Sequence, residues 1–342
     1  MSEPLRTVQV GCGGMAQRWA KLACELEDYQ IVGLVDINRE AAERTAERHG
    51  LGPDVVYETL RKALSATKPD VVFDVTVPEA HHKVVIPALR AGCHVLGEKP
   101  MSDSLARARR MVEAAEQAGR YYAITQTQRN VPAIRDFAAF CQGGAIGRIE
   151  EVHCDFFLGA HFGGFRDRMA DVLLKDMAIH HFDAARRLTG ADAHRVQCIS
   201  YNPPRSWFEG DANAFALFEM DRDIVYTYRG SWCAEGINTT WGCHWRVIGS
   251  EGTAEWNGGD VMAAQRLRDP QQAAFIRDLE DILVPRHETA PGAHEGYMLD
   301  FAHCIREGRT PETHCTDNIR SLAMVLAAVK SARTGRRQKV EW

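Results

Sequence analysis

The chain has 342 residues, of which 45% are hydrophobic and 25% charged, and its 41 lysines and arginines are nearly balanced by 46 aspartates and glutamates. This length predicts two domains of ordinary size. The net charge of −5 argues against a basic protein that binds nucleic acid or an anionic membrane surface. No apolar run approaches the roughly 18 residues of a membrane-spanning helix, so we expect neither a nucleic-acid nor a membrane partner.

Ten cysteines and fourteen histidines raise the question of disulfides or a metal site. The cysteines are scattered without a C-x-x-C pair, and the first residues contain no hydrophobic segment typical of a signal peptide. The histidine pairs His81-His82 and His180-His181 point in different directions on a regular element, and no H-E-x-x-H motif is present. We therefore expect a cytoplasmic protein with reduced thiols and no metal.

The first 126 residues alternate between strand-like and helix-like patterns. Apolar runs lie at Thr7–Val10, Ile31–Val35, Val71–Thr76, Val95–Gly97 and Tyr121–Thr125, with helix-like stretches at Ala16–Leu26, Arg39–His49 and Ser104–Ala118. Gly119 is placed to end the last of these helices. Short apolar strands joined by helices predict a doubly wound parallel sheet, so we expect an α/β domain over residues 1–126.

The pattern changes after Gly143-Gly144, within an expected second domain over residues 127–342. Aromatic and β-branched runs follow closely at Ile149–Leu158, Ala212–Glu219, Ile224–Ser231 and Thr240–Ile248, with helices expected at about Val172–Leu188 and Asp317–Arg333. Residues 220–223 suggest a connector between antiparallel neighbours, and Pro270–Gly296 suggests irregular structure. These runs predict an α+β domain with an open, mostly antiparallel sheet.

A glycine-rich motif follows the first predicted strand and opens a helix. The sequence Gly11-Cys12-Gly13-Gly14-Met15-Ala16 fits the pattern G-x-G-x-x-[GA]. The first glycine allows a tight turn, the second lets the backbone approach a pyrophosphate, and Ala16 permits close helix–strand packing. The phosphates would bind at the N-terminus of the helix, so this motif predicts a Rossmann domain that binds a dinucleotide.

Asp36 ends the second predicted strand at the distance expected for a ribose-binding acid. Its carboxylate can accept hydrogen bonds from both adenine-ribose hydroxyls and would repel a 2′-phosphate, which favours NAD. Arg39 lies nearby and could pair with such a phosphate, so NADP stays possible.

Two further segments stand at the ends of predicted strands. Thr76-Val77-Pro78-Glu79-Ala80-His81 ends the fourth strand and Gly97-Glu98-Lys99-Pro100 ends the fifth. Ligands of doubly wound sheets bind beyond the carboxyl ends of the strands, so we expect Thr76, Pro78, His81, Glu98 and Lys99 to line the cofactor site. A lysine there can also stabilise negative charge on a substrate oxygen.

Together with the glycine motif, these segments resemble the Gfo/Idh/MocA family of oxidoreductases, which includes glucose–fructose oxidoreductase and the inositol dehydrogenases. The resemblance covers essentially the whole chain. Glu98-Lys99-Pro100 is its most specific short mark, and Asp176-x-x-x-His180 is its companion in the second domain. The resemblance implies hydride transfer between NAD(P) and a sugar, polyol or related carbonyl compound.

Asp176, His180, Asp183 and Arg187 share one stripe of a predicted helix. A solvent-facing polar stripe is the alternative, but such stripes are usually rich in Lys and Glu. Asp176 and His180 also match the acid–histidine pair of the family. For Asp183 we expect an ion pair with Arg187 on the same helix face.

The expected reaction is a direct oxidation. His180 would take the hydroxyl proton as the carbinol carbon delivers hydride to the nicotinamide, because its ordinary pKa of about 6.5 suits a general base. Asp176 would orient His180 or bind the substrate hydroxyl, and Lys99 would stabilise the oxyanion. Some members of the family are thought to use the lysine as proton donor, so Lys99 and His180 could exchange roles.

The sequence departs from the sugar oxidoreductases before Asp176. Those proteins often carry a glycine run after an Arg-bearing loop, whereas this chain has Met169–Lys175. The preceding loop, His161–Arg166, is aromatic and cationic, so Arg166 could bind a substrate carboxylate, or the loop could be a solvent-exposed connection. The substrate itself is not predicted.

Several tryptophans lie in the second half, and Trp241, Cys243, Trp245 and Val247 alternate with Gly242, His244, Arg246 and Ile248. This is the period of a strand, and we expect a flat aromatic face that packs on another subunit. The family often oligomerises through this sheet, so the resemblance implies a homodimer or homotetramer.

Three functions compete. The first is an NAD-dependent dehydrogenase acting on a sugar or an inositol-like polyol. The second is an NAD-dependent glycosidase that oxidises its sugar transiently and regenerates the cofactor. The third is a regulator that senses NAD without catalysis, which the presence of Lys99, Asp176 and His180 disfavours.

Overall fold

The computed structural model describes residues 3–287 and 290–342, and the chain divides into two compact units. The first unit combines the chain up to Thr127 with Pro291–Leu322, and the second combines Gln128–Ala290 with Ala323–Trp342. The division that we expected at residue 126 did not include this return of residues 291–322 to the first unit.

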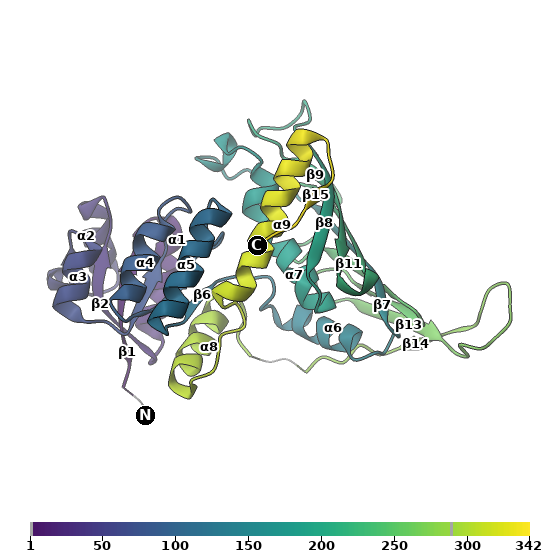
Figure 1. Ribbon diagram of the computed structural model, residues 1–342, viewed down its shortest axis with the longest axis horizontal. Helices are drawn as coiled ribbons and strands as arrows, with labels where there is room; N and C mark the ends of the chain where they lie inside the picture. The colour runs from purple at the N-terminus through teal and green to yellow at the C-terminus, as the bar shows by residue number, and fades with distance from the viewer. Residues whose placement is uncertain (1–2, 288–289) are drawn as a thin grey trace. The chain divides into compact units, whose positions relative to one another are not determined.

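A six-stranded parallel sheet forms the centre of the first unit (Figure 1). Its strands are β1 (Leu5–Val10), β2 (Tyr29–Val35), β3 (Val56–Tyr57), β4 (Val71–Asp74), β5 (His94–Gly97) and β6 (Tyr122–Ile124). Their order is β3-β2-β1-β4-β5-β6, the order of a dinucleotide-binding Rossmann sheet. The predicted α/β fold is confirmed.

Five helices connect these strands: α1 (Gly14–Glu25), α2 (Arg39–Arg48), α3 (Leu60–Thr67), α4 (His81–Arg90) and α5 (Leu105–Ala118). Ser104 caps the N-terminus of α5 by accepting a hydrogen bond from the Arg107 backbone. Gly119 ends this helix in the left-handed conformation, with a φ of 58°, as the sequence predicted.

Helix α8 (Ala293–Glu307) explains why residues 291–322 belong to the first unit. Met298, Phe301 and Ala302 lie in the same buried cluster as side chains of α1 and of the parallel sheet. The Tyr29 hydroxyl also donates a 2.5 Å hydrogen bond to the Met298 carbonyl. The apolar side of α8 therefore completes the core of the Rossmann unit.

A nine-stranded mixed sheet forms the centre of the second unit, in the order β14-β13-β12-β11-β7-β10-β9-β8-β15. In chain order its strands are β7 (Ile149–Phe157), β8 (Ala193–Tyr201), β9 (Asn213–Met220), β10 (Val225–Ser231), β11 (His244–Gly249), β12 (Gly252–Trp256), β13 (Met262–Leu267), β14 (Leu279–Ile282) and β15 (Gln338–Lys339). All pairs are antiparallel except β7 with β10. The predicted sheet type and the antiparallel connection at 220–223 are confirmed.

Two expectations about this unit were wrong in detail. The strand expected from Thr240 begins at His244, because Cys243 has a left-handed backbone with a φ of 65°. Pro270–Gly296 contains β14 and the start of α8, although residues 288–289 of this segment lie outside the described residues.

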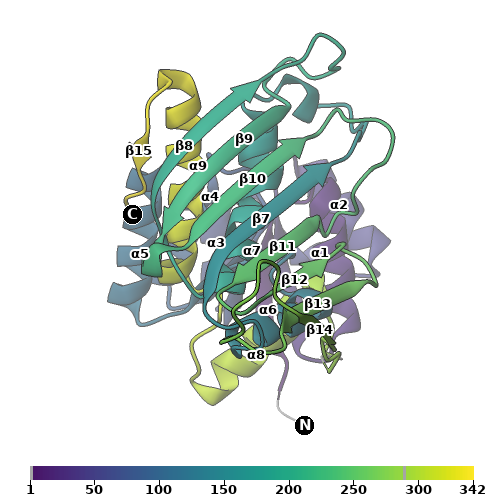
Figure 2. The ribbon, with the colours of Figure 1, turned by 90° about the vertical axis from the view of Figure 1, so that its right-hand side faces the viewer.

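Helices α6 (Pro132–Gln142) and α7 (Ile179–Thr189) lie behind the sheet, and the opposite face carries no helix among the described residues (Figure 2). Helix α9 (Cys315–Thr334) begins in the first unit and ends in the second. In the described part of the chain, no helix is both long and apolar enough to cross a bilayer.

The aromatic side chains that we expected at a subunit interface point mostly inward. Trp245, Cys243 and Val247 are buried within the chain, whereas Trp241 is exposed. Phe137 of α6 packs against Trp256, with ring centroids 6.3 Å apart, so the aromatic face covers the helices of its own subunit. The prediction that this face packs on a second subunit was wrong, because strand alternation identifies two faces but not which of them is internal.

Candidate functional site

The glycine loop between β1 and α1 is the first part of the site. Gly11 has a φ of +97°, and a Cβ added there would lie 2.4 Å from the Val75 carbonyl oxygen. Only glycine fits this position. Ala16, at the third position of the motif, is buried, and the Gln9 side chain donates hydrogen bonds to the Gly11 and Ala16 carbonyls.

Gly13 and Gly14 have a different environment from Gly11. A Cβ added at either would meet no atom within 4 Å, and Met15 beside them is exposed. These glycines therefore leave free space at the N-terminus of α1, where backbone N–H groups can bind phosphate. The loop fits a dinucleotide, for which Gly11, Gly13, Gly14, Met15 and Ala16 are the predicted contacts.

Asp36 follows β2 and reaches the glycine loop. Its carboxylate accepts hydrogen bonds from the Cys12 backbone N–H at 2.7 Å and from the Asn38 backbone N–H at 2.8 Å. Burial and the charge of Asp36 raise the pKa of the Cys12 thiol to about 12, so this thiol is neutral beside the loop. The Asp36 carboxylate thus lies directly beside the glycine loop.

The segment after β4 is organised by a buried aspartate that the sequence analysis did not single out. Asp74 Oδ1 accepts a 2.6 Å hydrogen bond from the Thr76 hydroxyl, and Asp74 Oδ2 lies 2.8 Å from His81 Nδ1. Burial alone would lower the pKa of His81, but the charge and hydrogen bond of Asp74, with the charges of Glu98 and Glu79, together raise the pKa above its ordinary value. His81, expected in cofactor contact, is fully buried and holds the loop that carries Thr76 and Pro78.

Glu98 ends β5 and connects three elements of the first unit. Its Oε1 accepts 2.8 Å hydrogen bonds from Trp19 Nε1 of α1 and from His294 Nε2 of α8, and its Oε2 accepts one from the Lys99 backbone N–H. Burial would raise the pKa of Glu98, but the hydrogen bond and charge of His294 hold it below its ordinary value. The carboxylate is therefore ionised, and its contact with the Lys99 backbone helps to position that residue.

Lys99 follows directly at the carboxyl end of β5 and is half-buried. The peptide bond between Lys99 and Pro100 is cis. The structure thus brings Lys99, Glu98, Thr76 and the glycine loop to the same edge of the parallel sheet, because parallel strands all end there.

In the second unit, the helix predicted over 172–188 begins with a π-helical stretch, Leu173–Ala178, and continues as α7. Asp176 lies in this stretch, and His180 follows in the first turn of α7. Both side chains are buried, with 9% and 7% exposure. This burial excludes the alternative of a solvent-facing polar stripe. Single π turns are often found at functional sites.

Arg166 contacts the first of these residues. Its Nε donates a 2.6 Å hydrogen bond to Asp176 Oδ2, and its guanidinium lies 4.7 Å from the ring centroid of Phe165 and 5.2 Å from that of Phe162. The loop before the helix is therefore tied to Asp176. Of the predicted substrate residues, Arg166 and Asp176 are in direct contact.

Asp183 has a partner that the sequence did not suggest. Arg129, from the segment before α6, donates hydrogen bonds to both carboxylate oxygens at 2.7 and 3.0 Å, and both side chains are buried. This two-pronged pair fixes α7 to the start of the second unit. Helix spacing alone favoured Arg187, because partners distant in the sequence are invisible to it.

Two family models match successive parts of the chain. Residues 5–126 match the model of the Gfo/Idh/MocA oxidoreductase family with an NAD-binding Rossmann fold, and residues 134–255 match a Gfo/Idh/MocA C-terminal domain. The chain is similar to D-apiose dehydrogenase of Paraburkholderia graminis, at 27% identity over 96% of this chain and 87% of that one.

It is also similar to an NAD+-dependent scyllo-inositol 2-dehydrogenase of Bacillus subtilis, at 25% identity over 98% of this chain and 96% of that one. The fold of the present chain resembles that of an oxidoreductase from Agrobacterium radiobacter that was crystallised with NAD+, L-tartaric acid and magnesium. The TM-score is 0.86, the sequence identity is 18%, and the match covers 99% of both chains. The chain therefore belongs to the Gfo/Idh/MocA family and is an NAD(P)-dependent oxidoreductase with an NAD-binding Rossmann domain.

Proposed function

We propose that the protein oxidises a CH–OH group of a sugar, a cyclic polyol or a related hydroxy compound, with NAD as the preferred acceptor. Burial of Asp176 and His180 within one helical stretch is the observation that carries this proposal. Ionisable groups are costly to bury, and those retained on an otherwise apolar helix often do chemistry. The names of the relatives, which act on apiose and inositol, support the substrate class.

The residues of the Rossmann unit would hold the cofactor. Gly13 and Gly14 leave space for the pyrophosphate, and Asp36 would accept hydrogen bonds from the adenine ribose. When bound, the nicotinamide supplies the acceptor for hydride. Asp36 carries a negative charge that would repel the 2′-phosphate of NADP, and this supports NAD.

His180 would remove the proton from the substrate hydroxyl, and Lys99 would stabilise negative charge on the same oxygen. Asp176, held by Arg166, would fix the position of the substrate hydroxyl or of the His180 ring. The reverse assignment, with Lys99 as the proton carrier, uses the same residues. Glu98 would act through Lys99 as a positioning residue.

Replacing the two central side chains tests this proposal. We expect Lys99→Ala and His180→Ala each to lower kcat at least about a hundredfold, with little change in the Kd for NAD, because both act on the reacting oxygen. The matched controls Lys21→Ala and His153→Ala remove partly exposed side chains and should retain activity. Unchanged kcat, or loss of NAD binding in parallel with activity, would contradict these roles.

We also propose that the protein self-associates as a dimer or tetramer through the uncovered face of the nine-stranded sheet (Figure 2). Four large apolar side chains lie exposed on the neighbouring strands β8 and β9, namely Ile199, Tyr201, Phe215 and Leu217. Contiguous apolar surface of this kind is typical of a protein interface.

A further inference from the structure

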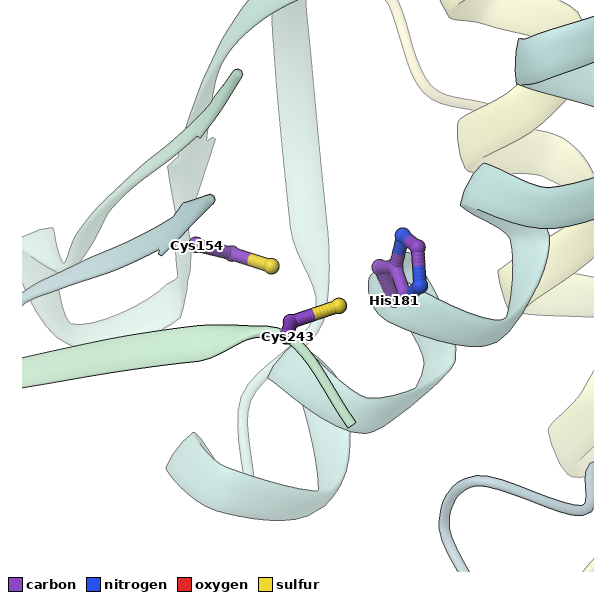
Figure 3. A group of neighbouring side chains, drawn as sticks. All are labelled: Cys154, His181 and Cys243. Carbon is purple, nitrogen blue, oxygen red and sulfur yellow. The ribbon is translucent and has the colours of Figure 1, made fainter. Parts of the chain in front are cut away.

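Three side chains with soft or borderline metal-ligand atoms meet beneath the nine-stranded sheet (Figure 3). Cys154 comes from β7, Cys243 immediately precedes β11, and His181 belongs to α7. Figure 3 shows both sulfurs directed toward the imidazole ring. The two Sγ atoms and a ring nitrogen all lie within 4.8 Å of one another, and none of the three residues is more than 1% exposed.

Among the described residues, only one of the two ring nitrogens of His181 has a hydrogen-bond partner. Its Nδ1 lies 3.2 Å from the Tyr228 hydroxyl, whereas its Nε2 is buried without a hydrogen-bond partner among the described residues. The ring of Phe156 packs on it at 4.7 Å. A buried polar atom without a hydrogen-bond partner is unfavourable, so a ligand for this nitrogen is expected.

We propose that Cys154, Cys243 and His181 bind a Zn²⁺ ion. Thiolates and imidazole are the ligands that zinc prefers, and two cysteines with one histidine form a known three-residue zinc set whose fourth position takes an exchangeable ligand. Zn–S distances of about 2.3 Å place the ligand atoms of a tetrahedral site roughly 4 Å apart or less, so modest side-chain movement closes the site.

The second nitrogen of His181 fits this role. Metal-bound histidines usually hydrogen-bond through the other ring nitrogen, which fixes the ring orientation. With Nε2 on zinc, Nδ1–H would donate to the Tyr228 hydroxyl, and the ring would then have partners at both nitrogens.

Charge favours Zn²⁺ over Cu⁺, the other metal ion that suits these ligands. Binding of Zn²⁺ by two thiols releases two protons and leaves a metal–dithiolate unit without net charge. Cu⁺ bound by the same two thiolates would leave one uncompensated negative charge in the core, where an unpaired charge is strongly disfavoured.

No sequence motif pointed to this cluster, and we expected the protein to hold no metal. Zinc motifs are usually recognised by short spacings such as C-x-x-C, whereas these ligands come from three distant segments. The proposal does not depend on the dehydrogenase function, because none of the three residues belongs to the proposed catalytic or cofactor set.

Cys243 provides a variant that should fold well. Its φ of 65° is unfavourable for any residue with a Cβ, so Cys243→Gly removes the thiol and relieves backbone strain at once. Cys198→Ala is the matched control, because it removes a buried thiol on β8 outside the cluster.

The test measures zinc in the full-length protein, reduced, stripped with a chelator and reloaded with Zn²⁺ alone. By mass spectrometry of the metal, we expect about one zinc per chain in the wild type and in Cys198→Ala, and at least about a tenfold loss in Cys154→Ala and Cys243→Gly. Zn²⁺ should raise the Tm of the wild type but not of these two variants. Replacement by Co²⁺ should give a thiolate charge-transfer band only where both thiols are present.

Four outcomes would overturn the proposal. The fully reduced wild type could bind far less than one zinc, or Cys243→Gly could retain it, which would place the metal elsewhere. The chain could bind Cu⁺ while rejecting Zn²⁺, against the charge argument. Finally, the isolated protein could carry a Cys154–Cys243 disulfide and no metal.

Discussion

Gly11 and Gly13 stand two residues apart in one loop, yet different neighbours constrain them. Gly11 is held by the protein itself, because a Cβ there would collide with the Val75 carbonyl. Gly13 meets nothing within 4 Å, so the folded chain alone does not require glycine there. The requirement at Gly13 comes from the ligand, whose pyrophosphate must approach the backbone closely.

Replacement of Gly11 by alanine should therefore affect stability, whereas replacement of Gly13 should affect cofactor binding. We expect Gly11→Ala to lower the free energy of unfolding by at least about 2 kcal/mol, because of the clash and the positive φ. Gly13→Ala should change stability by less than about 0.5 kcal/mol but raise the Kd for NAD by at least about tenfold. Denaturant unfolding and fluorescence titration measure the two effects. An unchanged Kd for Gly13→Ala would mean that the dinucleotide does not pass this loop.

For single side chains, the sequence revealed motifs with short local spacing but not hydrogen-bond partners from distant segments. The glycine motif and Asp36 were recognisable because their spacing reflects one local turn and one neighbouring strand. Glu98 directly follows β5, as the sequence suggested, whereas His81 begins α4, and the partners of both side chains were not visible. Asp74 lies in a buried strand, and His294 reaches Glu98 from far along the chain, which only the fold reveals.

At the scale of elements, α7 shows what periodicity can and cannot tell. The polar spacing of Asp176, His180 and Asp183 predicted a helix, and the structure has one. Periodicity did not distinguish a solvent-facing stripe from a buried one, because that depends on what packs around the helix. The π-helical start and the Arg129 partner of Asp183 likewise depend on tertiary contacts.

A hydrogen bond between β5 and the residue before β6 depends on the protonation state of His94. His94 Nδ1 accepts a 3.0 Å hydrogen bond from the backbone N–H of Tyr121, just before β6, and this requires the neutral ring. Burial, with the charge of Arg120, lowers the pKa of His94 to about 4. Because the folded pKa lies below the unfolded value of about 6.5, the neutral ring stabilises the fold above pH 6.5, and this contribution is lost as the pH falls toward 4.

We therefore expect wild-type stability to fall more steeply between pH 6.5 and 4 than that of His94→Asn, whose side-chain oxygen can accept the same hydrogen bond without titrating. The difference in the free energy of unfolding should reach about 2 kcal/mol at the acidic end, less than the full pKa shift implies because the ring is partly solvated. Urea unfolding across this range measures it. Parallel pH profiles of the two proteins would show that His94 contributes nothing.

At the scale of the whole molecule, sequence patterns were sufficient for the class of fold. Alternating strands and helices predicted the parallel sheet, and closely spaced aromatic strands predicted the antiparallel one, because local runs determine both sheet types. The return of α8 to the first unit was not visible, since its apolar stripe fits any core. The inward direction of Trp245 was missed for a related reason: alternation does not say which face of a sheet the chain itself covers.

The segment before Asp176 departs from the pattern that the resemblance to the sugar oxidoreductases implies. Asp171, within the segment 169–175, pairs with Lys175 at 3.0 Å and with Arg333 at 2.5 Å. The two ion pairs of Asp171 thus hold the segment that leads into the π-helical stretch.

Net formation of reduced nicotinamide by the wild-type protein would establish the proposed oxidation in a single assay. A panel of inositols, aldoses, sugar acids and aminosugars, each offered with NAD and with NADP, is followed by absorbance, with an aryl glycoside as the competing substrate. We predict that at least one free polyol or sugar yields stoichiometric reduced cofactor, faster with NAD than with NADP. Release of the aryl alcohol without net reduced cofactor would instead indicate a glycosidase, and binding of NAD with no turnover of any panel member would indicate a protein that is not a dehydrogenase.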